Sequence, residues 1–182
     1  MKKQDIGAAR LRNQRVTLAT RISPSDRALV DRVVLGDTPA HKVDGDPWAE
    51  TLLRRISEDV IVRDYLASFA HTEAGAHRVL GIALALARMT KRTGEVGAAA
   101  LGVAGWAALS LGRWAWADAL GIASLAAFEG YALGLLIRQI ISERWFAELL
   151  EIESSVTEGR IRACSAVVLH RLTESRAHVH LN

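Results

Sequence analysis

Two neighbouring stretches of this chain are almost free of charge, and they limit what it can fold into. Residues 96–112 carry no charged side chain, and residues 114–128 carry only Asp118. The intervening Gly-Arg pair predicts a turn between two helices. Because helices that are apolar on every side lie either in a core or in a membrane, the rest of the fold must accommodate an apolar hairpin at about residues 96–128.

The composition of this hairpin favours a core over a membrane. Its first helix, with seventeen residues, would rise about 25 Å, whereas the hydrocarbon layer is about 30 Å thick. Most of these residues are Ala, Gly or Ser, and the acid of the second helix would cost about 2.5–3.5 kcal/mol at the membrane centre. Small residues instead allow two helices to approach closely, with Trp106, Trp114 and Trp116 filling the gaps. We therefore expect no membrane span.

The overall composition predicts a mainly all-α protein. Hydrophobic residues make up 50% of the chain and charged residues 24%, which excludes a disordered chain. Only three prolines are present, and arginine outnumbers lysine; Ala, Leu and Arg all favour helix. We predict a compact helical bundle around the hairpin, with residues 1–15 as a flexible basic arm and residues 16–182 as a single helical domain.

Cysteine usage and the N-terminal sequence point to the cytoplasm. Cys164 is the only cysteine, so a disulfide framework is excluded and a reducing compartment fits. The first residues, Met-Lys-Lys-Gln-Asp, lead into polar, arginine-rich sequence without the apolar run of a signal peptide. We expect a cytoplasmic protein.

Capping signals predict where several helices begin. Ser23, Pro24 and Asp26 form an N-cap, a first-turn proline and a capping-box-like acid, and Gly36 ends that helix. Further starts are indicated at Asp46-Pro47, at Ser57 and at Thr72, with the last of these helices ending near Thr90. From Gly130 an amphipathic pattern resumes and can continue through Leu149 and Ile152.

Only the two ends of the chain show the alternation typical of strands. Val16, Leu18, Thr20 and Ile22 alternate with residues of the opposite face, and so do residues 177–181. Because a single strand needs a partner, a minor pair of terminal β-strands is one possible addition to the helical fold.

No constellation of residues predicts catalysis, a metal or a cofactor. His71 and His77 lie six residues apart and would face different sides of a helix, while His178 and His180 lack further ligands nearby. Glu58, Asp59 and Asp64 are interleaved with arginines, which favours a salt-bridged surface over acid–base work. We predict a protein that is not an enzyme. The lone Asp118 should lie near the turn and meet Arg113 or water, and Tyr131 should find a partner for its hydroxyl.

Two functions from different classes remain. In the first, a helical face binds a protein partner or a second copy of the chain. Trp145, Phe146, Leu149 and Leu150 would supply part of that surface, because they crowd one end of a helix with more apolar area than it can hide.

The second function is nucleic-acid binding or regulation. Residues 1–34 hold eight Lys or Arg against three Asp, and Arg10, Arg12 and Arg15 lie in the predicted arm. Such an arm, with the helix at 24–35, predicts weak, salt-sensitive and non-specific binding to nucleic acid.

Part of the chain resembles a tetratricopeptide-type helix pair. Within residues 101–129, Gly105 lies seven residues before the turn glycine Gly112, and Trp114 and Ala117 match the aromatic and small positions of the second helix. Ser124 and Glu129 depart from the repeat. No second copy occurs at the period of about 34 residues, so the resemblance implies one hairpin of this style and not an array.

A longer resemblance covers about residues 46–141. The motifs Val62-Arg63-Asp64, Ala85-Leu-Ala-Arg88 and Gly105-Trp-Ala-Ala-Leu109 are similar to the helical C-terminal half of a domain of unknown function that is widespread in actinobacteria and their phages. The family's N-terminal α/β half has no counterpart here, and Phe128-Glu129 stands where the family has Asp-Pro. The resemblance implies a soluble helical domain from a bacterial or phage source and implies no activity.

Overall fold

The computed structural model describes residues 15–90 and 93–154, the last nine of them (146–154) by their backbone alone. All regular structure in these ranges is helical, which confirms the mainly all-α prediction. The chain divides into two units, Met1–Ile141 and Ser142–Asn182. The packing described below lies in the first unit, and the predicted boundary between an arm and a single domain stays a prediction.

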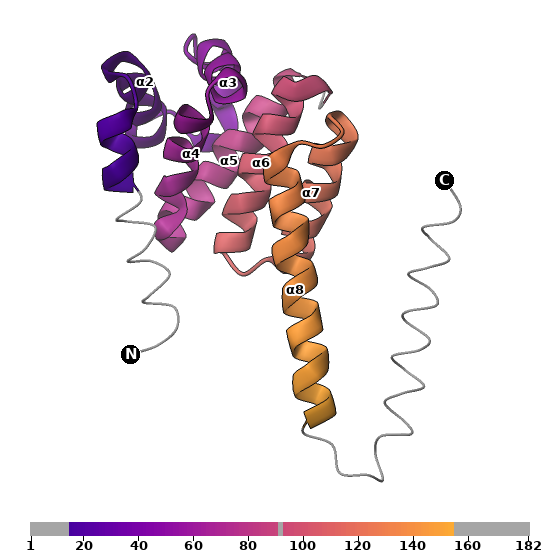
Figure 1. Ribbon diagram of the computed structural model, residues 1–182. Helices are drawn as coiled ribbons and strands as arrows, with labels where there is room; N and C mark the ends of the chain where they lie inside the picture. Colours follow the sequence, from indigo (N-terminus) through magenta and orange to yellow (C-terminus); the bar gives the residue numbers. More distant parts are fainter. Residues whose placement is uncertain (1–14, 91–92, 155–182) are drawn as a thin grey trace. The chain divides into compact units, whose positions relative to one another are not determined.

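A short helical segment at residues 15–21 precedes the named elements. In chain order these are α2 (Pro24–Leu35), η1 (Ala40–Gly45), α3 (Ala49–Glu58), α4 (Val60–Ser68), η2 (Phe69–His71), α5 (Glu73–Met89), α6 (Gly94–Ser110), α7 (Trp114–Ala127) and α8 (Ala132–Ser154) (Figure 1).

The strand predicted over residues 16–22 is wrong, because this segment is helical. Leu18 and Ile22 are both buried, each with 7% of its surface exposed, and their spacing of four residues puts them on one side of a helix. Val16, which the strand pattern would have placed with them, is 63% exposed. The proposed partner strand at residues 177–181 lies outside the described residues.

The predicted caps of α2 and α5 are confirmed. Ser23 Oγ accepts a hydrogen bond from the Asp26 amide at 3.1 Å, with Pro24 in the first turn, and the helix ends before Gly36. Thr72 Oγ1 accepts from the Gly75 amide at 3.1 Å. Each hydroxyl thus satisfies one of the amides that a helix start leaves unpaired.

The starts of α3 and α4 depart from the prediction in instructive ways. Asp46 Oδ1 does accept from the Trp48 amide at 2.9 Å, but the helix proper begins at Ala49. Ser57 does not cap α4. It lies inside α3 and donates its hydroxyl to the Arg54 carbonyl, while Asp59 accepts from the Ile61 amide at 2.8 Å. A charged carboxylate is the stronger acceptor for a helix start.

Helix α6 lies at the centre of the first unit. It packs against α3, α4, α5 and α7 (Figure 1), and all of its residues from 97 to 105 are buried. The prediction that the first arm of the hairpin is a central core helix is therefore confirmed. Among the described residues, no helix combines the length and the apolar character needed to cross a membrane.

Glycines set the distances between α6, α7 and the first turns of α8. A Cβ on Gly105 would lie 2.8 Å from Ile137 Cδ1, and one on Gly102 would lie 3.2 Å from Leu133 Cδ2. Across the same crossing, a Cβ on Gly121 would lie 3.2 Å from Ile137 Cγ2. Ile137 is fully buried between these glycines, so the helices approach as closely as side chains permit.

The three hairpin tryptophans do not share one role. Trp106 and Trp114 are partly buried against the core, as gap-filling residues would be. Trp116 is 53% exposed and lies over no core position, so the prediction that it fills a gap is wrong. Its ring instead lies beneath the guanidinium of Arg113, 5.5 Å from the ring centroid.

Two arginines of α5 hold the segment between α2 and α3. Arg78 donates to the carbonyl oxygens of Val33 at 3.0 Å and Thr38 at 3.1 Å, and also to those of Val34 and Gly36. Its guanidinium thereby satisfies carbonyls that the end of α2 leaves free. Arg88 contacts the same segment further on, through Asp44 at 2.8 Å and the His41 carbonyl at 2.7 Å.

Candidate protein-binding surface

Helix α7 has one buried side and one exposed side, and neither carries a charged side chain. Its inner side, formed by Ala117, Gly121 and Ser124, is buried in the packing with α6 and α8. Its other side is exposed and is here called the outer face; it consists of Ala115, Trp116, Ala119, Ile122 and Ala126.

The outer face carries no polar side chain. Ala115, Ala119, Ile122 and Ala126 follow one another at intervals of four, three and four residues, which places them along one line of the helix. Ile122 is 50% exposed and Trp116 53%. A helix that is apolar on every side is normally buried on every side, so the exposure of this face is unusual.

The single charge of α7 lies at the edge of the outer face and is neutralised. Asp118 Oδ1 accepts a hydrogen bond from Arg138 Nη1 of α8 in a partly exposed ion pair. The expected pairing with Arg113 is wrong, because Asp118 pairs with Arg138 of α8 whereas Arg113 stacks on Trp116.

Both ends of α7 carry a charge of their own. Arg113 occupies the N-cap position, and its own side chain makes no capping hydrogen bond to the start of the helix. Glu129 follows the C-cap residue Phe128. Both charged residues are exposed, and Phe128 is 45% exposed.

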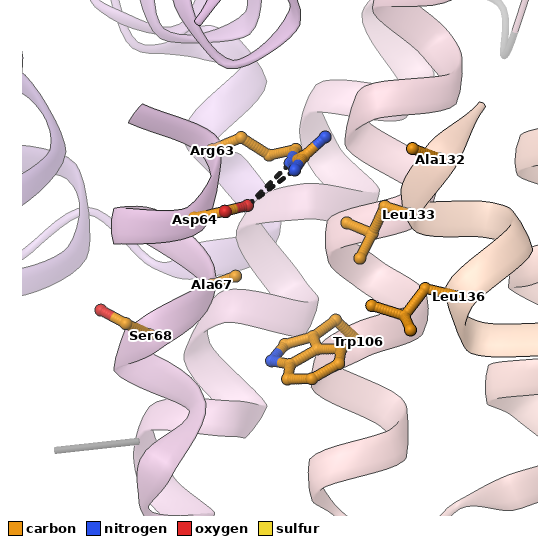
Figure 2. A pocket seen from close by; sticks show the side chains of 8 residues that line it. All are labelled: Arg63, Asp64, Ala67, Ser68, Trp106, Ala132, Leu133 and Leu136. Carbon is orange, nitrogen blue, oxygen red and sulfur yellow. Dashed lines mark hydrogen bonds and ion pairs between the residues drawn. The ribbon is translucent and has the colours of Figure 1, made fainter. Parts of the chain in front are cut away.

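A small pocket opens between α4, α6 and α8 (Figure 2). It has a volume of about 170 Å³, and Arg63 and Asp64 face Trp106, Leu133 and Leu136 across it. Binding sites for small molecules are typically about 300–1,000 Å³. The pocket is therefore large enough for a single side chain of a partner and too small for most cofactors.

The polar groups of this pocket already satisfy one another. Arg63 donates from Nε and Nη2 to Asp64 Oδ1 at 2.9 and 2.8 Å, and from Nη1 to the Tyr131 hydroxyl at 3.3 Å. Burial acts to lower the pKa of Arg63, but its bonds to Tyr131 and Asp64 outweigh burial and raise it. The hydroxyl partner expected for Tyr131 is thus Arg63. A compensated ion pair of this kind is a poor acid or base.

The interleaved arginines and carboxylates form the salt-bridged surface that their sequence pattern predicts. Arg55 binds both carboxylate oxygens of Asp26, at 2.8 and 2.9 Å, and also contacts Glu58 and Asp59 at 3.3 Å. The hydrogen bond from Arg55 holds the pKa of Asp26 below its usual range, although burial opposes this shift. In the described ranges no group of three or more His, Cys, Asp or Glu side chains is placed to hold a metal ion.

The predicted nucleic-acid contacts are only partly described. Arg10 and Arg12 lie outside the described residues, and Arg15 lies over the ring of Phe69, 4.7 Å from its centroid. On α2, Arg27 pairs with Asp31 and Arg32 lies over Trp48. These three cations are thus held by side chains of the protein, and nucleic-acid binding stays a prediction.

Of the four residues in the predicted interface near the end of α8, only Trp145 has a described side chain. Trp145 is 55% exposed, whereas the side chains of Phe146, Leu149 and Leu150 lie outside the description. Sequence reasoning missed the outer face of α7, because it treated both arms of the hairpin as equally buried. The signal that could have revealed it was the unbroken run of Ala and Ile at positions where an ordinary surface helix would have polar residues.

Comparison with known proteins gives no relationship on which to build. No family model, no curated protein and no solved structure matches the chain. The resemblances to a tetratricopeptide-type hairpin and to an actinobacterial domain therefore stay predictions, and the function has to be argued from the site.

Proposed function

We propose that this chain is a non-enzymatic, cytoplasmic helical protein that binds another protein through the outer face of α7. The observation that carries the proposal is the exposure of Ile122 and Trp116 on a side of the helix without one polar residue. Contiguous apolar patches on soluble proteins commonly mark interaction sites.

The energetic gain from covering this face is appreciable. Full burial of a large apolar side chain stabilises by about 1.5–3 kcal/mol. Ile122, Trp116 and Phe128 are each about half exposed, so covering them would contribute about 1 kcal/mol per residue. The surrounding alanines add little area but let a partner helix approach closely.

The pocket between α4, α6 and α8 supports the non-enzymatic part of the proposal. Arg63 and Asp64 are committed to each other and to Tyr131, and the volume of about 170 Å³ leaves little room for a substrate. A partner that covers α7 is favoured over a reaction in this pocket.

Oxidative footprinting inside cells tests the proposal even while the partner is unidentified. Hydroxyl radicals modify exposed Trp side chains, so Trp116 should be modified in dilute purified protein and protected in cells that express the chain at its natural level. Trp48, which is 42% exposed on a different part of the surface, is the matched control and should be modified equally in both samples. Equal modification of Trp116 in both samples would contradict the proposal.

A further inference from the structure

We propose that the protein bound by the outer face is a second copy of this chain, with the two α7 helices antiparallel across a two-fold axis. This inference rests on the proposed function and names its partner. It is carried by two independent features of α7: the spacing of its outer face and the position of its terminal charges.

The outer face is complementary to itself when the helix direction is reversed. The intervals along Ala115, Ala119, Ile122 and Ala126 are four, three and four residues, so the line reads the same from either end. About an axis between residues 120 and 121, Ala119 of one copy lies opposite Ile122 of the other. A two-fold interface requires such self-complementarity, and along this line Ile122 of each copy meets the small Ala119 of the other.

The terminal charges of α7 are placed against its own dipole. A helix N-terminus favours negative charge and a C-terminus favours positive charge. Arg113 stands at the N-terminus and Glu129 just beyond the C-terminus, so within one copy both charges are unfavourably placed.

In the antiparallel pair the same charges become favourable. The register that sets Ala119 opposite Ile122 also brings Glu129 of the second copy beside Arg113. The carboxylate would then lie near the N-terminus of α7, which the N-cap residue Arg113 does not cap with its own side chain, and the dipole and the opposite charge would both stabilise it. Because the axis repeats every contact, both ends of the pair gain.

Aromatic residues extend the contact on both flanks. Trp116 would lie beside Leu125 of the second copy, and Phe128 beside Arg113 of the second copy. A pair of four-turn helices still buries less than the roughly 1,200 Å² of a typical stable interface. The dimer is therefore expected to dissociate in the micromolar range.

Sedimentation equilibrium from low micromolar to near-millimolar protein tests this pairing. The full chain should show a monomer–dimer equilibrium, and Ile122→Glu should weaken it by at least about tenfold, because the acid would be buried near the axis. Val60→Glu replaces another apolar residue that is 54% exposed and should leave the equilibrium unchanged. Ala119→Lys serves in the same way if Ile122→Glu does not fold, as judged by its far-ultraviolet spectrum and cooperative melt.

Charge reversal tests the direction of the two helices. Arg113→Glu and Glu129→Arg should each weaken the dimer by about fivefold, because each places like charges together twice. The double variant should dimerise more tightly than either single variant, because opposite charges face each other again, but less tightly than the unmodified chain, because an arginine of the second copy then lies near the N-terminus of α7.

Three results would overturn the inference: a monomer at every concentration, a dimer indifferent to both Ile122→Glu and Ala119→Lys, or a double variant no tighter than the single ones. A monomer whose Trp116 is nevertheless protected in cells would overturn the second copy as partner and leave the proposed function standing. If Trp116 is modified equally in cells and in purified protein, the proposed function itself is wrong.

Discussion

Polar side chains join the helices from α2 to α5 to one another, in addition to the apolar core that these helices share. Hydroxyls and carboxylates cap three helix starts, Arg78 binds four carbonyl oxygens near the end of α2, and Arg55 joins α2 to α3 through Asp26. These interactions position segments far apart in the sequence while the apolar side chains of the same helices form the core.

The helices from α6 onward are held in another way. Gly102, Gly105 and Gly121 let Leu133 and Ile137 enter between the backbones, and the one buried hydroxyl of α7, that of Ser124, donates to the Ala98 carbonyl at 2.8 Å. Arg138 bound to Asp118 is the ion pair that ties α7 to α8 in this packing.

The difference shows that a helix of small apolar residues can pack closely on one side and still expose an apolar surface on the other. Charge does not distinguish the inner side of α7 from its outer face, because neither carries a charged residue. The two sides differ in the size of their side chains, with Gly121 and Ser124 inside and Trp116 and Ile122 outside. Helices α2 and α3 expose charged residues to water, whereas α7 exposes Ile122 and Trp116. Helices α2 to α5 therefore present a surface suited to water, whereas α7 leaves an apolar surface, its outer face, uncovered.

Gly105→Leu should give the largest loss of stability, because it adds a large side chain where α6 and α8 approach each other closely. Even a Cβ at this position would lie 2.8 Å from Ile137 Cδ1, and overpacking of this kind costs about 3 kcal/mol. Chemical denaturation should show the loss or an absence of cooperative unfolding. Gly45→Ala, where no atom lies within 4 Å of the new Cβ, should change the free energy of unfolding by less than about 0.5 kcal/mol. Equal stability of the two variants would contradict the glycine crossing.

Arg78→Met should give the next largest effect, in the polar region. It leaves the carbonyls of Val33, Gly36 and Thr38 without their donor in a part-buried place, at a cost of about 2 kcal/mol. Arg88→Met removes a more exposed guanidinium, paired with Asp44, and should cost less than about 1 kcal/mol. Urea denaturation of both variants measures the two losses in the free energy of unfolding. A larger loss for Arg88→Met than for Arg78→Met would contradict the role assigned to Arg78.

Asp26→Asn should have a smaller effect that depends on pH. The Arg55 hydrogen bond lowers the pKa of Asp26 in the folded protein, so its contribution is complete above the ordinary aspartate value near 4 and is lost as the pH falls through the folded pKa. The variant should be less stable by about 1 kcal/mol at pH 7. Denaturation midpoints of the two proteins should converge as the pH falls from about 4 toward 2, and a constant difference would argue against this ion pair.

Ser124→Ala should have the smallest effect, although its side chain is fully buried. The Ala98 carbonyl that accepts from Ser124 Oγ lies within a helix, so removing the hydroxyl leaves no orphaned donor. We expect a loss of less than about 1 kcal/mol in thermal unfolding. A loss larger than that of Arg78→Met would mean that the hairpin also depends on polar contacts.

The sequence allowed much of the fold to be predicted, because its signals are local. Ser23 and Thr72 cap the helices they were expected to cap, since a hydroxyl before a helical run acts within three residues. Helix α6 was expected at the centre because residues 96–112 carry no charge to expose. The strand at residues 16–22 failed because alternation over a short stretch does not distinguish a strand from a helix that buries Leu18 and Ile22.

The candidate site was harder to predict, because it depends on contacts between distant residues. The pairing of Asp118 with Arg138 spans twenty positions, and the bond from Arg63 to Tyr131 spans sixty-eight. Residue types alone indicate neither pair. The Ala and Ile residues along α7 indicate an apolar helix, but only the structure shows which side of it lies against α6 and which side is exposed.

Chemical cross-linking of mixed isotopes tests the self-pairing of α7 most directly. Positions 113 and 129 lie at opposite ends of α7, whose 14 residues span about 21 Å, too far for a zero-length carbodiimide link within a copy. Equal amounts of nitrogen-14 and nitrogen-15 protein carrying Arg113→Lys should therefore give a link between positions 113 and 129 that contains both isotopes, and Ile122→Glu in the same background should abolish it. Absence of the mixed-isotope link under conditions where sedimentation shows a dimer would contradict the antiparallel pairing of the outer faces.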